Sequence, residues 1–202
     1  MIEQSRISRK PFTKINITVF FILTSLLAGP IMGAGRTVPL FKNEWKMVSF
    51  PDFFNFDVPE PWPQWDPAVN WFLDQVEAEN PDFVLIAGDL VNGHWWEGHR
   101  CVEQMGALYY SGWKRRLEGH DLKYYVAVGD HELGDDPWKD DKKMELVPHF
   151  ERVFAEHMGM PQNGPDGQKG RAYYVLNKNV LMITVETFEI HDGRVVSTVS
   201  GD

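Results

Sequence analysis

Short apolar runs alternate with longer amphipathic segments over residues 45–158 of this 202-residue chain. The runs at 45–50, 83–87 and 124–128 have the length and character of buried strands. The segments at 66–81 and about 98–118 repeat apolar residues every three or four positions, as amphipathic helices do, and a third helix is expected around 142–158. This alternation predicts an α/β fold, in which helices connect the parallel strands of one sheet.

Turn-forming residues mark the ends of several of these segments. Asp66 is a candidate N-cap of the first helix, Pro67 suits its first turn, and Pro81 closes it. After the third helix, residues 172–186 predict two strands around a turn at 177–179.

The N-terminal residues have the order of a secretory signal peptide. Four basic side chains within residues 1–14 precede an uncharged apolar run at 15–28, and small residues follow up to Gly35. The apolar run is shorter than the roughly 20 residues of a membrane span, although an uncleaved anchor is the alternative. We therefore expect a signal peptide at 1–35, a single domain at 36–202, no membrane contact after cleavage, and a secreted or periplasmic location.

The charge of the chain limits its partners. Residues 1–35 hold four basic side chains and one acidic one, so their removal takes the net charge from −9 to −12. An acidic chain of this kind is not expected to hold nucleic acid as a stable partner. Cys101 is the single cysteine, so the chain forms no internal disulfide. The sequence does not indicate an oligomeric state.

Acidic residues follow each of the three predicted strands. Asp52 comes shortly after the first, and Gly-Asp pairs place Asp89 and Asp130 directly after the second and third. Ligands collect beyond the carboxyl ends of strands in open α/β sheets, so these carboxylates are expected to converge there. Because like charges repel, a bound cation would stabilise the group. With His131 next to Asp130, the mixed oxygen and imidazole ligands suit Zn, Fe or Mn better than calcium.

Two short motifs carry a family resemblance. "GDLVN" at 88–92 and "GDHE" at 129–132 resemble the Gly-Asp-x-x-Asp/Asn and Gly-Asn-His-Glu/Asp motifs of the calcineurin-like metallophosphoesterases, and the resemblance covers roughly residues 45–190. It implies an α/β/β/α sandwich. It also implies hydrolysis of phosphoric mono- or diesters by water that two divalent or mixed-valence transition-metal ions activate, with a small phosphate ester as the substrate.

The same resemblance implies a role for each matching residue. Asp89 would bridge two metal ions, Asp52 would hold the first and Asp130 the second. His131 would act as general acid or contact the phosphate, and Asn92 would orient His131.

The chain departs from the family pattern in three ways. Phe54 replaces the histidine of the first Asp-x-His motif, with Asn55 or Asp57 as possible substitutes, and Asp130 replaces the usual Asn. The later Gly-His-x-His motif does not occur before Asp202. The domain is therefore expected to be incomplete, and the alternative function is a non-catalytic remnant or binding module that lacks the later histidine ligands.

The remaining polar residues near the motifs have simpler interpretations. Glu132 and Asp135 are expected to be loop charges, and the three strand-end acids could be ordinary turn residues. Five histidines are assigned no role, namely His94, His99, His120, His149 and His157. No Gly-x-Gly-x-x-Gly and no P-loop follows a predicted strand, which argues against a nucleotide-binding α/β domain.

Overall fold

The computed structural model describes residues 45–53, 63–135, 138, 141–191 and 194–197. The predicted signal peptide at 1–35 lies outside this part of the chain, as do Phe54 and the two candidate substitutes Asn55 and Asp57. Along the described part, no helix combines the length and apolar character needed to cross a bilayer.

Three parallel strands form the central sheet in the order in which they occur along the chain. They are β1 (Met47–Phe50), β2 (Phe83–Ile86) and β3 (Tyr124–Val126). Phe50 pairs with Ile86, and Ile86 pairs with Val126, so the three strands end level at one edge of the sheet. The predicted α/β alternation is confirmed, and it brings the segments after the strands together.

Helix α1 (Trp65–Ala78) connects β1 to β2, but its beginning differs from the prediction. The N-cap position is Gln64, which makes no side-chain capping bond, and Asp66 lies inside the first turn. Asp66 instead pairs with Arg116 of the next helix. Asn80 adopts a left-handed φ of 48° and ends the helix just before Pro81.

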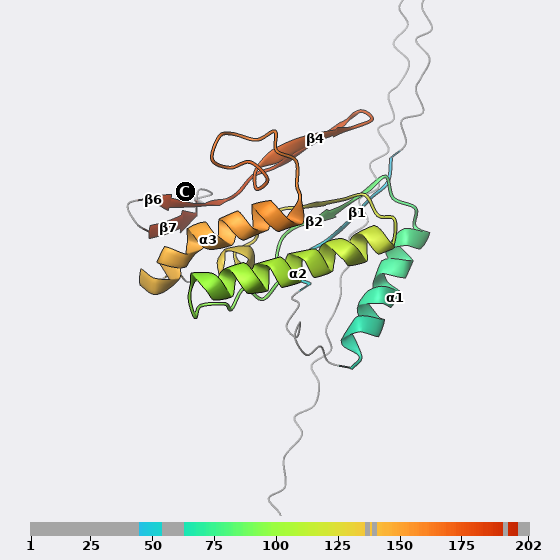
Figure 1. The fold of residues 1–202 in the computed structure, drawn as a ribbon. Helices are drawn as coiled ribbons and strands as arrows, with labels where there is room; N and C mark the ends of the chain where they lie inside the picture. The colour runs from blue at the N-terminus through green and yellow to red at the C-terminus, as the bar shows by residue number, and fades with distance from the viewer. Residues whose placement is uncertain (1–44, 54–62, 136–137, 139–140, 192–193, 198–202) are drawn as a thin grey trace, which may run out of the picture.

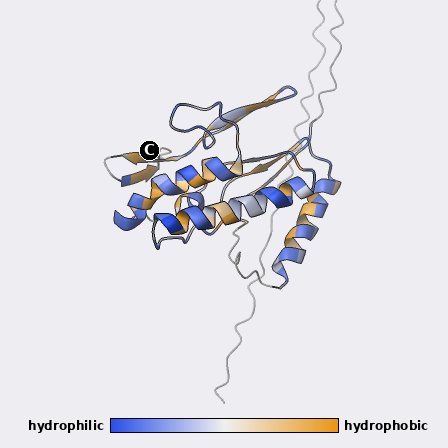
Figure 2. Ribbon diagram, viewed as in Figure 1, coloured by the Kyte–Doolittle hydropathy of each residue, from blue (hydrophilic) through white to orange (hydrophobic). Residues whose placement is uncertain are grey.

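Helix α2 (His99–Gly119) runs beside α3 (Asp141–Met158), and α1 lies across one end of α2 (Figure 1). All three helices carry hydrophobic and hydrophilic stripes, as amphipathic helices packed on a core do (Figure 2). The two helices α2 and α3 pack tightly at Gly106, where an added Cβ would lie 2.5 Å from Cγ2 of Val153. Glycine is therefore needed at this crossing for steric reasons.

Trp113 of α2 connects the helix layer to the loop after β2. Its side chain is 1% exposed, and its indole Nε1 donates a 3.0 Å hydrogen bond to the main-chain oxygen of Leu90. The ring also packs edge-on against Phe53 and Trp65, with centroid distances of 5.1 and 5.9 Å. One buried aromatic residue thus fixes the loop that carries Asp89.

Two antiparallel hairpins follow α3. The first is β4 (Tyr173–Asn177) with β5 (Val180–Thr184), as predicted, and the second, which was not predicted, is β6 (Phe188–His191) with β7 (Arg194–Ser197). Tyr173 attaches the first hairpin to the sheet, because its hydroxyl donates to the main-chain oxygen of Val126 at 2.8 Å. In the described residues, the expected sandwich thus consists of the parallel sheet, its helices and two separate hairpins.

One face of the β4–β5 hairpin is apolar and exposed. Tyr174 lies opposite Ile183, and Leu176 lies opposite Leu181, and each of these side chains is more than half exposed. The opposite face, with Tyr173 and Thr184, is buried against the rest of the domain.

Candidate metal centre at the two Gly-Asp loops

The loops that leave β2 and β3 touch each other at two glycines. A Cβ added to Gly88 would lie 2.7 Å from the main-chain nitrogen of Gly129, and one added to Gly129 would lie 2.1 Å from Oδ1 of Asp89. A side chain at either position would push the loops apart, because real Cβ contacts are longer than this. The glycine of each Gly-Asp pair is therefore required for the two aspartates to approach each other.

Asp52 and Asp89 both adopt left-handed backbone conformations, with φ of 55° and 58°. Aspartate tolerates this region better than most residues, although the conformation costs about 1 kcal/mol or more. The Asp52 main-chain nitrogen lies 3.4 Å from the oxygen of Gly88, and its side chain hydrogen-bonds to that of Asp89. The segment after β1 thus contacts the Gly-Asp loop that follows β2.

His131 begins a short 3-10 turn after β3, η1 (His131–Leu133), and Asp130 is the residue just before it. The turn is closed by a hydrogen bond from the Leu133 nitrogen to the Asp130 oxygen at 2.9 Å. As a result, Asp89, Asp130 and His131 each offer one ligating atom within 4.8 Å of the others. The structure thus brings three of the predicted site residues together, namely Asp89, Asp130 and His131, and it places Asp52 next to Asp89.

The imidazole of His131 is oriented by the main chain. Its Nδ1 lies 2.7 Å from the main-chain oxygen of Asn92, so Nδ1 carries the proton and donates it to this carbonyl. The sequence predicted that Asn92 orients His131, and the contact that the structure shows is made by the backbone of Asn92. Gly93 allows this approach, since it has a φ of 72° and its added Cβ would lie 2.0 Å from the His131 oxygen.

Glu132 is the residue of the site that the sequence interpretation missed. The prediction that it is a loop charge is wrong, because its side chain is fully buried. One carboxylate oxygen accepts from the nitrogens of Asp89 and Gly129 at 2.7 and 2.9 Å, and the other accepts from Leu90 at 2.8 Å. Burial raises the pKa of Glu132, while these backbone donors oppose that shift. The sequence feature that could have pointed to Glu132 is its position in "GDHE", directly after Asp130 and His131, which both have predicted roles.

The electrostatics of the site favour a bound cation. Burial raises the pKa of Asp89 to about 7, with further contributions from the negative charges of Glu132 and Asp130 and from the hydrogen bond with Asp52. The charge of His131 opposes this rise only in part, so burial and the neighbouring carboxylates still disfavour the ionised form of Asp89. A metal ion would stabilise that ionised form, and the donor set of carboxylate oxygens with one imidazole fits Fe, Zn or Mn.

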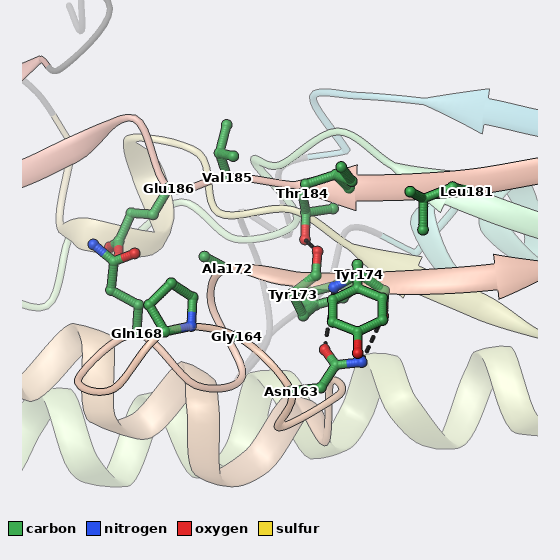
Figure 3. Close-up of a pocket in the computed structure, with 12 residues that line it drawn as sticks. Asn163, Gly164, Gln168, Ala172, Tyr173, Tyr174, Leu181, Thr184, Val185 and Glu186 are labelled. Atoms are coloured by element: carbon green, nitrogen blue, oxygen red, sulfur yellow. Dashed lines mark hydrogen bonds between the residues drawn. The ribbon is translucent and has the colours of Figure 1, made fainter.

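An open groove lies elsewhere, between the β4–β5 hairpin and the segment at 163–168 (Figure 3). Its volume is about 740 Å³, and its walls include Tyr174, Leu181 and Ile183 of the exposed hairpin face. None of the predicted site residues lines it. The groove is therefore separate from the loops that carry the aspartates.

Comparison with known protein families agrees with this geometry. Residues 59–195, more than half of the chain, match the family model described as calcineurin-like phosphoesterase. Asp89, Asn92, Asp130 and His131 lie inside the matched range, whereas Asp52 precedes it. No curated protein matches the chain.

Proposed function

Because this chain belongs to the calcineurin-like phosphoesterase family, we propose that it hydrolyses phosphoric mono- or diesters at the edge of the parallel sheet. Metal-dependent hydrolysis of phosphoesters is the chemistry that the family suggests, and its members typically bind two transition-metal ions. One observation carries the proposal for this chain. Asp89 and Asp130 lie together beside His131, Asp52 contacts Asp89, and the half-buried Asp89 has a pKa of about 7.

Each side chain has a distinct part in this proposal. Asp89, at the centre of the group, would bridge two metal ions, with Asp52 on one side and Asp130 on the other. Bound metal ions would neutralise the phosphoryl oxygens and make a water more acidic. His131, held by its Nδ1 to the Asn92 carbonyl, would offer Nε2 to the leaving group as a general acid or contact a phosphoryl oxygen.

The alternative function is a domain that binds metal without turnover. One observation favours it: the ligand group around Asp89 contains a single imidazole among the described residues. Turnover therefore has to be measured separately from metal binding.

The first test replaces Asp89 by asparagine. Asparagine accepts the left-handed φ of Asp89 and keeps the shape of the side chain, while it removes the charge that would bridge the metals. With Mn²⁺, Fe²⁺ or Zn²⁺ added, we expect Asp89→Asn to lower kcat/KM for an aryl phosphate or a bis-aryl phosphate by roughly 100-fold or more.

Asp121→Asn is the matched control. Asp121 also has a left-handed φ, of 51°, but it is exposed in the turn after α2, so its substitution should leave the rate unchanged. Equal rates for wild type and Asp89→Asn would reject hydrolysis at this site and leave the metal-binding alternative.

We also propose that the protein is exported, which the order of basic, apolar and small residues at 1–35 supports. N-terminal sequencing of the mature protein from the host's extracytoplasmic fraction should find a start near residue 36. A full-length chain that stays in the cytoplasm would contradict export.

A further inference from the structure

A second group of ligating side chains lies at the outer rim of the two loops. His94 follows the Asn92–Gly93 segment after β2, and Asp135 follows η1. Nε2 of His94 lies 2.8 Å from Oδ2 of Asp135, and Nε2 of His131 lies 3.6 Å from Oδ1 of the same carboxylate. The two imidazole centroids are 6.0 Å apart, and the three residues each offer a ligating atom within 4.8 Å of the others.

The backbone around this group is held in place independently of any ligand. The Asp135 nitrogen donates to the Asp130 oxygen at 3.0 Å, and the Asp135 oxygen accepts from Nζ of Lys143 at 2.7 Å. Trp96 packs on the His94 ring at 4.7 Å, and its indole nitrogen donates to the Gly134 oxygen at 2.8 Å. The loop positions are thus fixed by contacts that leave the Asp135 carboxylate facing the two imidazoles.

We propose that His94, His131 and Asp135 form a binding site for one transition-metal ion of the zinc type, distinct from the carboxylate group around Asp89. Two imidazoles and one carboxylate, with a fourth position open to water, are a ligand set that zinc uses in proteins. Ligand atoms bound to a tetrahedral zinc ion lie about 3.3 Å apart, and the measured separations of 2.8 and 3.6 Å lie on either side of this value.

The orientation of His131 supports the proposal. Metal-binding histidines commonly donate their second ring nitrogen to a carbonyl or carboxylate, which fixes the ring and the tautomer. His131 does this through Nδ1 and the Asn92 carbonyl, so Nε2 is the nitrogen turned toward Asp135. The His94 side chain is 45% exposed, which gives a metal ion access from solvent.

A metal ion at this site would affect catalysis, a consequence that rests on the proposed hydrolysis. The same Nε2 of His131 would serve the leaving group there, and one ring nitrogen cannot serve both partners at once. Zinc bound at His94, His131 and Asp135 would therefore withdraw His131 from its part in the reaction.

Cobalt(II) titration of the full chain tests the proposal directly. Cobalt in a four- or five-coordinate site with imidazole ligands absorbs much more strongly in the visible than six-coordinate cobalt bound by oxygen. We expect one equivalent of Co²⁺ to give this strong band in the wild type. His94→Gln should remove the band and weaken Zn²⁺ binding at this site by roughly tenfold or more.

Two further variants locate the metal. Asp89→Asn should keep the band, since Asp89 is not a ligand here, and His157→Gln, a histidine of α3 outside the group, should also keep it. Circular dichroism of each metal-free variant would confirm that it is folded. Because the His94 side chain is 45% exposed and glutamine keeps a polar group there, its variant should pass this check.

Two results would overturn the proposal. One is a wild-type spectrum that shows six-coordinate cobalt only. The other is a strong band that survives His94→Gln but is lost in Asp89→Asn, which would assign the metal to the carboxylate group and support the proposed hydrolytic site instead. The two proposals can thus fail independently.

Discussion

Glu132 shows how a single buried side chain can hold a site together. Its carboxylate accepts from main-chain nitrogens on both Gly-Asp loops, so it links the segments after β2 and β3. Buried backbone donors that lose their acceptor cost about 1–3 kcal/mol each. The position of Asp89 relative to Asp130 therefore depends on a residue that is hidden from any substrate.

Glu132→Gln should lower the free energy of unfolding by about 2–4 kcal/mol. The substitution keeps the volume of the side chain but turns an amide NH₂ toward a backbone donor, so at least one hydrogen bond is lost and two donors face each other. Urea unfolding of the metal-free protein measures the effect. Glu118→Gln, an exposed glutamate of α2, is the control and should change stability by less than about 0.5 kcal/mol. A Gln variant as stable as the wild type would show that the carboxylate is not needed.

At the scale of the elements, most of the helices and strands could be predicted from the spacing of apolar residues and from the rules of sheet topology. The helices, the three parallel strands and the first hairpin follow from apolar spacing, because burial of one face is a property of the pattern. The aspartates at strand ends follow from the rule that parallel strands end at one edge. This rule identifies Asp89 and Asp130 as candidate site residues, and the metal-binding roles predicted for them come from the family resemblance.

Other features depended on contacts that spacing does not encode. Burial of Glu132 could not be inferred, since a charged residue in a loop is ordinarily solvated and only the backbone donors around its carboxylate make burial tolerable. Asp66 suited an N-cap locally, but a cation on another helix, Arg116, pairs with it instead. The grouping of His94 with Asp135 likewise requires the two loops to be placed against each other.

The crossing of α2 and α3 gives a prediction at this scale. Gly106→Ala would place a methyl group 2.5 Å from Val153, so the helices must separate or repack, and we expect a loss of about 1–3 kcal/mol in the free energy of unfolding. Gly112→Ala in the same helix is the matched control. Its added Cβ would meet nothing closer than 4.0 Å, so alanine should instead stabilise the helix by about 0.5–1 kcal/mol. The same sign for both variants in thermal or urea unfolding would contradict the packing argument.

At the scale of the whole molecule, a buried ion network joins α3 to the segments on either side of the first hairpin. Arg171 pairs with Glu151 of α3 at 2.6 Å and with Glu186, which follows β5. Burial raises the pKa of Glu186 to about 7, while the charge of Arg171 opposes this rise and the charge of Glu151 adds to it. Two carboxylates share one guanidinium here, so the network gains an excess negative charge once Glu186 ionises above about pH 7.

This network predicts how stability depends on pH. Because the folded protein holds the Glu186 proton up to about pH 7 and the unfolded chain releases it near 4.5, this residue makes stability fall as the pH rises between these values. Glu186→Gln should flatten the pH profile of the unfolding free energy between pH 5 and 7.5 by about 1–3 kcal/mol. Glu156→Gln, at an exposed position of α3, should leave the profile unchanged. An unaltered slope in Glu186→Gln would show that Glu186 titrates normally.

The three aspartates of the site come from segments that lie far apart along the chain and meet only when β1, β2 and β3 are aligned. In a nascent or partly denatured chain the same residues are present, but the sheet that places them close together has not formed. An ion held jointly by Asp52, Asp89 and Asp130 would thus be lost on the first cooperative opening of the sheet. Metal content per chain would then serve as an assay of correctly assembled protein in any preparation.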